Sequence, residues 1–181
     1  MRVIFLDRDG VINKYPGDKK YVTCQKEFRF LPNAKRAIAR LYKRNFKLFV
    51  ISNQAGVGKG LYSQKALDSI TRNMLLGIEK AGGRLESVYY CTHREEDDCL
   101  CRKPRAGSID IIRKKYPINI KKSFFIGDTI RDVKTAKAAG CKSILLLSGK
   151  EKLKNSRNWE IKPDLVFKNL QQAADFILRQ K

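Results

Sequence analysis

The feature that most constrains this chain is a series of short apolar runs without polar alternation, separated by stretches of helical periodicity. Such runs are typical of β-strands that are covered on both faces. Strands that alternate with helices form parallel β-α units, so we expect an α/β fold with a doubly wound, mostly parallel sheet. The runs are residues 3–6, 48–51, 88–90, 124–126 and 144–147, with a short final strand at 165–167.

Apolar residues recur at helical spacing between these runs, and the expected helices have recognisable ends. We expect helices at about 34–42, 64–81, 109–116, 133–139 and 170–177. Ser63 is expected to cap the second helix, and Gly140 to end the fourth. The polar and basic stretch 149–163 is expected to be a surface connection.

The size and composition predict one soluble domain. The chain has 181 residues, of which 43% are hydrophobic, enough for one core, so we expect a single domain over residues 1–181. No stretch approaches the roughly 20 apolar residues that cross a bilayer, and charged residues interrupt the first apolar run. We therefore expect a cytoplasmic protein without a membrane partner, with a monomer favoured.

The charge balance is strongly basic, with 39 Lys and Arg against 18 Asp and Glu and a formal net charge of +21. Such a charge attracts anions, and nucleic acid is one candidate partner. The basic residues are spread along the chain rather than grouped in one arm, which is also typical of a solvated surface. The charge therefore allows nucleic acid as a partner but does not favour it.

Acidic residues follow two of the expected strands, at the edge where open α/β sheets carry their sites. Asp7 and Asp9 leave the first strand on the same side, and Gly10 permits a sharp exit. Asp128 follows the fourth run, and Asp132 lies in the first turn of the next helix. Clustered carboxylates favour a hard cation such as Mg²⁺. A solvated turn would also explain Asp7 and Asp9, and a favourable helix charge would explain Asp132.

Two further positions carry groups that suit a phosphate. Ser52 is a hydroxyl at the end of the second run, and Lys103 precedes the third helix. Near the strand ends a lysine neutralises phosphate as a point charge, although a surface cation is the default in a chain this basic. The glycine-rich segment 56–60 is not a Walker A loop, because Lys59 is followed by Gly60.

Four motifs follow one another along the alternating α/β chain. They are a strand-end DxD (Asp7 and Asp9), Ser52, Lys103 and a GDxxxD (Asp128 and Asp132). As a set they resemble the four motifs of the haloacid dehalogenase-like superfamily of phosphohydrolases, over about residues 3–147. The resemblance implies a Rossmann-like sheet and hydrolysis through an aspartyl-phosphate. Because a phosphate monoester repels a carboxylate by about 4 kcal/mol per charge pair at ~4 Å, cations have to offset this repulsion.

The same resemblance implies a role for each motif residue. Asp7 is expected to attack phosphorus, and Asp9 to act as general acid and then as general base. The carboxylates of Asp7 and Asp128, with the backbone carbonyl of Asp9, are expected to hold Mg²⁺. Ser52 and Lys103 would hold the phosphoryl oxygens, and Asp132 would support the metal or Lys103.

Four soft or borderline ligands lie in one segment, which predicts a metal site. Cys91, His93, Cys99 and Cys101 have the spacing CxHx₅CxC, and His93 is the only histidine of the chain. A closed Cys₃His set is adequate for a structural Zn²⁺ site, so we expect a zinc loop at 91–101 inserted before Lys103. The alternative is an oxidisable cysteine-rich loop without metal.

The segments DRDGVIN, ISNQAGVGKG, YYCTH and CRKP narrow the resemblance. They resemble the D-glycero-D-manno-heptose 1,7-bisphosphate 7-phosphatases closely and the histidinol-phosphate phosphatases, which share such a zinc loop, less closely. The closer resemblance implies substrate contacts for Ser52, Asn53, Gln54, Arg102 and Lys103. The spacing of the motifs leaves room for a flap at about 11–30 and for no cap domain.

The leading hypothesis is therefore a Mg²⁺-dependent sugar-phosphate phosphatase that removes the 7-phosphate of D-glycero-D-manno-heptose 1,7-bisphosphate. Its product would lead to nucleotide-activated heptose for a bacterial surface polysaccharide. The alternatives are a histidinol-phosphate phosphatase and a nucleic-acid 3′-phosphatase, the latter motivated by the charge and the open site. A catalytically silent, zinc-stabilised phosphate-binding module belongs to a different class.

Overall fold

The computed structural model describes residues 1–180 and contains a six-stranded sheet with the order β3-β2-β1-β4-β5-β6. Each pair of neighbouring strands is parallel, so the predicted α/β class is confirmed. The order reverses between β1 and β4, which is the topological switch point of a Rossmann-like sheet. The strands are β1 (Val3–Leu6), β2 (Lys47–Asn53), β3 (Ser87–Cys91), β4 (Phe124–Gly127), β5 (Lys142–Leu146) and β6 (Leu165–Phe167).

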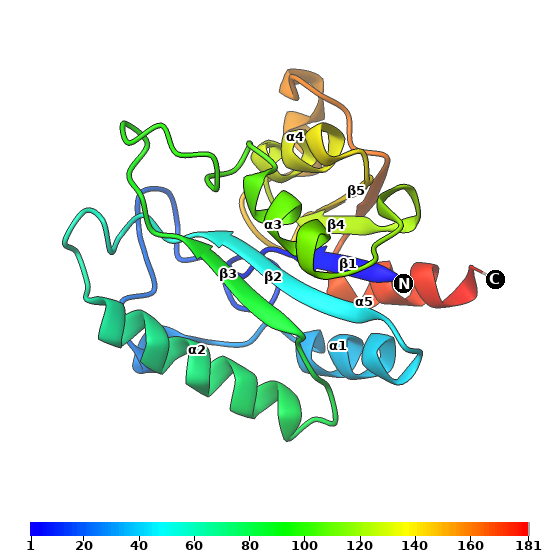
Figure 1. Ribbon diagram of the computed structural model, residues 1–181, viewed down its shortest axis with the longest axis horizontal. Helices are drawn as coiled ribbons and strands as arrows, with labels where there is room; N and C mark the ends of the chain where they lie inside the picture. Colours follow the sequence, from blue (N-terminus) through cyan, green and yellow to red (C-terminus); the bar gives the residue numbers. More distant parts are fainter. Residues whose placement is uncertain (181) are drawn as a thin grey trace.

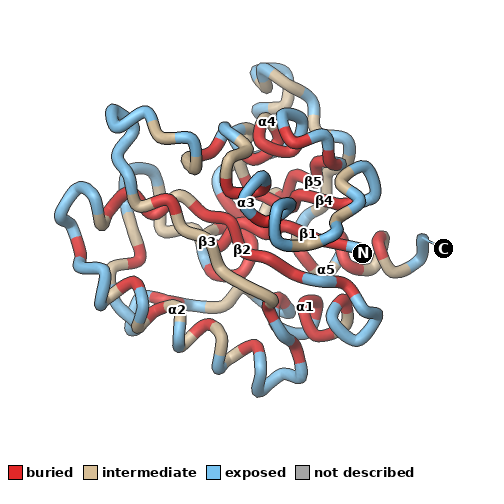
Figure 2. Tube along the Cα trace, in the orientation of Figure 1, coloured by how far each residue is buried: buried red, intermediate tan, exposed pale blue. Residues whose placement is uncertain are grey.

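Helices cover both faces of the sheet (Figure 1). Successive side chains of a strand point to opposite faces, so Ile4 and Leu6 of β1 pack under one layer of helices, and Val3 and Phe5 under the other. The first layer contains α1 (Ala34–Lys43), α2 (Gln64–Glu79) and α5 (Leu170–Arg179), and the second contains α3 (Gly107–Lys115) and α4 (Ile130–Ala139). Figure 2 shows the central strands buried between them.

The predicted helix ends are largely confirmed. The hydroxyl of Ser63 accepts a hydrogen bond from the backbone N–H of Ala66 at 3.2 Å and caps α2. Gly140 ends α4 with a φ of 79°, a conformation that glycine adopts without strain. Two apolar stripes extend too far: Tyr42 lies within α1 but is 37% exposed, and Ala81 lies beyond the end of α2.

The segment 149–163 is more than the surface connection that its composition predicts. It contains a short 3₁₀ helix, Leu153–Asn158, but it begins against the sheet edge. There the backbone N–H groups of Lys150 and Glu151 donate hydrogen bonds to Asp128, at 2.7 and 3.1 Å. Among the described residues, no helix combines the length and apolar character needed to cross a membrane.

A carboxylate ties the start of β5 to the loop before β6. Asp164 Oδ2 accepts hydrogen bonds from the backbone N–H and the hydroxyl of Ser143, both at 2.7 Å, and Lys137 pairs with the other oxygen. Partial burial acts to raise the pKa of Asp164, but the bonds from Lys137 and Ser143 outweigh it and hold the pKa at about 2. The ionised form therefore stabilises the fold.

We expect Asp164→Asn to lower the free energy of unfolding by about 1 kcal/mol at pH 7, a small value because the side chain is 37% exposed. The folded pKa lies below the unfolded value of about 3.9, so the stabilisation is present above about pH 4 and is lost as the pH falls towards 2. Urea unfolding of both proteins across this range measures it. Asp175→Asn, which removes a single ion pair with Arg40 at similar exposure and no bonds to a strand, is the control and should cost less than about 0.5 kcal/mol. Equal losses would contradict the assignment.

Candidate active site

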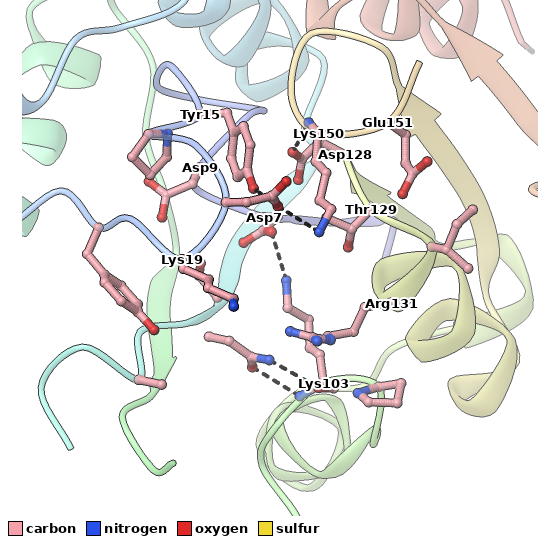
Figure 3. A pocket seen from close by; sticks show the side chains of 18 of the residues that line it. Asp7, Asp9, Tyr15, Lys19, Lys103, Asp128, Thr129, Arg131, Lys150 and Glu151 are labelled. Atoms are coloured by element: carbon pink, nitrogen blue, oxygen red, sulfur yellow. Dashed lines mark hydrogen bonds and ion pairs between the residues drawn. The ribbon is translucent and has the colours of Figure 1, made fainter. Parts of the chain in front are cut away.

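A pocket of about 860 Å³ opens at the carboxyl ends of β1, β2 and β4, next to the switch point of the sheet. Asp7 follows β1, Ser52 lies at the end of β2, Lys103 precedes α3 and Asp128 follows β4. All four line the pocket, and Figure 3 shows Asp7, Lys103 and Asp128 around its floor. The structure thus brings together residues that the sequence separates by as many as 121 positions.

Three carboxylates gather around one ammonium group at the floor of the pocket. One oxygen each of Asp7, Asp128 and Asp132 lies within 4.8 Å of the others. Lys103 is 3% exposed, and its Nζ lies 3.0 Å from Asp7 Oδ2 and 2.6 Å from Asp132 Oδ1. Asp7 and Asp128 point into the same cluster, as one shared cation site requires.

Burial leaves this cluster with more negative charge than Lys103 can offset. Burial is the main reason why the pKa of Asp7 is raised to about 6, while Lys103 opposes the shift. Burial also raises the pKa of Asp128 well above its ordinary value, and the charge of Asp7 adds to this. Burial acts to lower the pKa of Lys103, but Asp132 and Asp7 outweigh it and the pKa is raised. These residues therefore fit a hard divalent cation, which would offset the excess charge.

Asp132 has both oxygens engaged. Oδ2 accepts from the backbone N–H of Thr129 at 3.1 Å and from its hydroxyl at 2.7 Å, within a capping box at the start of α4. Oδ1 pairs with Lys103. Of the two roles open to Asp132, the geometry favours support of Lys103 and leaves Asp7 and Asp128 for a cation.

Two glycines leave room for the Asp128 side chain. A Cβ at Gly10, which has a φ of +78°, would overlap the Asp128 carboxylate, and so would a Cβ at Gly149. The hydroxyl of Ser148 donates to the backbone carbonyl of Gly10 at 2.7 Å and holds the two loops together. The loop after β5 is therefore part of the site, which the composition of segment 149–163 does not reveal.

Asn53 holds the loop that carries Lys103. Its Oδ1 accepts from the backbone N–H of Lys103, and its Nδ2 donates to the carbonyl of Lys103, both at 3.0 Å. Asn53 and Arg102 also line the pocket, and Arg102 donates to the carbonyl of His93 at 3.4 Å. The end of β2 and the loop at 91–101 therefore both contact the segment that carries Arg102 and Lys103.

Asp9 is clamped by three side chains. Arg8 donates to both carboxylate oxygens at 3.0 to 3.1 Å, Asn13 Nδ2 donates to Oδ1 at 2.8 Å, and Gln54 Nε2 donates to Oδ2 at 2.9 Å. The hydroxyl of Tyr62 donates to Gln54 Oε1 at 2.8 Å. Gln54 is fully buried and does not line the pocket, so the structure places it behind the wall, whereas the resemblance implies a substrate contact.

Sequence reasoning missed the supporting residues Arg8, Asn13, Tyr62 and Lys150. Arg8 is 0% exposed although arginine is rarely buried without a partner, and only its neighbour Asp9 in the sequence signals the pair. Asn13 and Tyr62 carry no motif, and Lys150 acts through its backbone N–H, which any residue except proline supplies.

The four predicted zinc ligands lie together at the end of β3 and in the loop that follows. Adjacent ligand atoms are 3.4 to 3.8 Å apart around the ring Cys91, Cys99, Cys101 and His93. A tetrahedron with Zn–S bonds of about 2.3 Å has edges of about 3.8 Å, so these four residues fit one tetrahedral ion.

Cationic side chains surround the mouth of the pocket. Asp18 pairs with Lys150 at 2.8 Å, and Glu160 pairs with Lys134. Lys19, Lys59 and Arg131 also line the mouth, and the described residues provide no ion-pair partner for them. Within residues 1–180 no inserted domain covers this opening, in agreement with the prediction of a capless site.

Comparison with known proteins agrees with this geometry. The HAD-hydrolase-like family model matches residues 100–173. The D-glycero-β-D-manno-heptose-1,7-bisphosphate 7-phosphatase of Pseudomonas aeruginosa is 33% identical over 148 residues, which cover 82% of each chain. The enzyme of that name from Neisseria meningitidis is 30% identical over 99% of this chain and 96% of its own. This chain belongs to the heptose bisphosphate phosphatase family.

A solved structure of the family supports the fold. The D,D-heptose 1,7-bisphosphate phosphatase of Bordetella bronchiseptica was solved with magnesium and phosphate, and it superposes on this chain with a TM-score of 0.90. It is 30% identical and each chain is covered completely. The Rossmann-like fold and the assignment to haloacid dehalogenase-like hydrolases are therefore confirmed.

We expect Lys103→Met to lower the free energy of unfolding by about 3 kcal/mol, because it leaves the buried carboxylates of Asp7 and Asp132 without their cation. The double variant Lys103→Met/Asp132→Asn should lose less than Lys103→Met alone, since it removes one of those charges. Urea unfolding of both variants and of Asp132→Asn completes the double-mutant cycle. Additive losses would show that the two side chains do not stabilise each other.

Proposed function

We propose that this protein is a Mg²⁺-dependent phosphatase that removes the 7-phosphate of D-glycero-D-manno-heptose 1,7-bisphosphate through an aspartyl-phosphate. The observation that carries the proposal is the joint presence of the buried Asp7–Lys103–Asp128 cluster and relatives of this activity along almost the whole chain. We place the reaction in the cytoplasm, on a route to nucleotide-activated heptose.

Asp7 is positioned as the nucleophile. Its Oδ1 accepts from the backbone N–H of Arg8 at 2.7 Å, and its Oδ2 faces Lys103 Nζ at 3.0 Å. These two contacts hold the carboxylate at the pocket floor, so that an oxygen can attack phosphorus in line with the leaving group. Asp7 and Asp128, with the backbone carbonyl of Asp9, would hold Mg²⁺, whose charge offsets the repulsion between carboxylate and phosphate when it is bound.

Lys103 and Ser52 are suited to hold the phosphoryl oxygens. Ser52 is 3% exposed at the end of β2, and its hydroxyl lies beside Gln54 Nε2 at 3.2 Å. Groups that are already fixed in this way stabilise the developing charge without reorganising. Asp9, 19% exposed at its side chain, donates a proton to the leaving oxygen and later takes one from the attacking water.

The cationic side chains at the mouth of the pocket suit a substrate with a second anionic group. Arg102, Arg131 and Lys59 project there from three different segments, and the pocket is large enough for a sugar bisphosphate. A phosphate at the far end of the sugar would find these cations while the reacting phosphate lies against Lys103. This arrangement favours a bisphosphate over a substrate with one phosphate.

The Cys₃His cluster is best explained as a structural zinc site. All four tetrahedral positions would be filled by protein ligands, which leaves none for substrate or water. The ligand Cys101 directly precedes Arg102 and Lys103, so a bound ion would hold the backbone that presents both cations.

We expect Asp7→Asn to abolish phosphate release while the chain remains folded, because the substitution removes the nucleophile and one buried charge. The assay measures inorganic phosphate from both anomers of the heptose bisphosphate, from histidinol phosphate and from a 3′-phosphorylated oligonucleotide, with and without Mg²⁺. The wild-type protein should prefer the bisphosphate and require Mg²⁺. Preference for the oligonucleotide, with activity falling steeply in salt, would replace the proposed substrate.

We expect about one Zn²⁺ per chain in protein purified without chelator, and little in Cys101→Ala. The variant should also lose thermal stability and phosphatase activity, because the loop before Lys103 loses its anchor. Cys24→Ala, which removes an exposed thiol outside the cluster, is the matched control and should keep metal and activity. Wild-type protein without bound zinc would refute the site.

A further inference from the structure

The clamp around Asp9 contains one contact that comes from another strand. Arg8 and Asn13 belong to the same β1 loop as Asp9, whereas Gln54 follows β2 and lies 45 positions away. Contacts within one loop hold the carboxylate relative to that loop. Of the three contacts, only the one from Gln54 fixes the Asp9 carboxylate relative to Ser52 and the β2 side of the pocket.

The orientation of the Gln54 amide follows from its partners. A carboxylate only accepts hydrogen bonds, so the Nε2 group must face Asp9 Oδ2, which lies 2.9 Å away. Oε1 then faces Tyr62, whose hydroxyl donates to it at 2.8 Å. The second N–H of the amide is directed to Ser52 Oγ at 3.2 Å. The buried amide is thus satisfied on both ends by protein groups.

Gln54 is also placed where it cannot act on substrate directly. It is 0% exposed, and Tyr62 behind it is 8% exposed. The pocket is lined by Asp9, Ser52 and Asn53, but not by Gln54. Any effect of Gln54 on the reaction therefore has to pass through Asp9 or Ser52.

We propose that Gln54, held by Tyr62, is a positioning residue that aims the Asp9 carboxyl at the leaving-group oxygen. This inference rests on the proposed function, in which Asp9 protonates that oxygen. A general acid works only within hydrogen-bond reach of its target, so a carboxyl freed from Gln54 spends less time in the productive position. The phosphoryl group, held by Lys103 and Ser52, stays in place.

The position of Asp9 matters more for some substrates than for others. The alkoxide of a sugar is a poor leaving group and needs a proton, whereas 4-nitrophenolate leaves without one. A mispositioned Asp9 carboxyl should therefore slow phosphoryl transfer from a sugar phosphate and leave transfer from an activated aryl phosphate nearly unchanged. A general defect of the fold would slow both, and a lost substrate contact would raise KM.

The test compares kcat/KM for the heptose bisphosphate and for 4-nitrophenyl phosphate. This ratio reports the steps up to departure of the leaving group and not the later hydrolysis of the aspartyl-phosphate, in which Asp9 is the base for both substrates. Gln54→Leu has a similar volume and removes the three hydrogen bonds. We expect kcat/KM for the sugar phosphate to fall about 10-fold or more without a rise in KM, with little change in kcat/KM for the aryl phosphate. Tyr62→Phe should show the same pattern with a smaller loss. Asp9→Asn should show it with a loss of about 100-fold or more.

Tyr116→Phe is the matched control. Its ring packs edge-on against Phe49 at a centroid distance of 5.1 Å and does not line the pocket, so the variant should keep both activities. Equal losses of kcat/KM for the two substrates in Gln54→Leu, a rise in KM with kcat unchanged, or full activity would overturn the inference. The proposed function fails separately, if the wild-type protein releases no phosphate from the bisphosphate. In that case the comparison uses whichever alkyl phosphate the wild type hydrolyses.

Discussion

The repulsion among buried carboxylates at the carboxyl edge of the sheet is the constraint on which the site depends. Asp7 and Asp132 pair with the one buried lysine, Asp128 lies beside them, and proton uptake or a further cation relieves the excess of negative charge. A cation held there would act together with Lys103 to attract an anionic phosphate that the carboxylates alone would repel.

The surrounding structure holds each charged group by a different element. Thr129 and the first turn of α4 hold Asp132, the peptide of Lys150 holds Asp128, and Asn53 holds the backbone of Lys103. Such fixed groups favour catalysis because they need not reorganise when charge develops on the phosphoryl oxygens. The zinc loop, in the proposed role, extends this support to Arg102 at the pocket mouth.

Much of the fold was predictable because its signals are local. A strand covered on both faces has to be apolar throughout, and a helix end is often capped by a residue such as Ser63 or Gly140. Both features can therefore be recognised from a few neighbouring residues. The motif acids, Ser52 and Lys103 were also predictable as a group, since parallel strands bring their carboxyl ends to one edge. The helix stripe that ran on to Ala81 was wrong because periodicity does not show where packing against the sheet ends.

The sequence by itself determined the parallel α/β architecture, the acids and cations of the sheet edge and the four soft ligands before α3. Only the tertiary structure decided how these groups are partnered: Asp132 serves Lys103, the loop after β5 closes on Asp128, and Gln54 lies behind the pocket wall rather than in it. The physical reason is that hydrogen bonds and burial depend on which distant segments meet in space. A backbone N–H such as that of Lys150, or a hydroxyl such as that of Tyr62, carries no sign of its partner in the sequence.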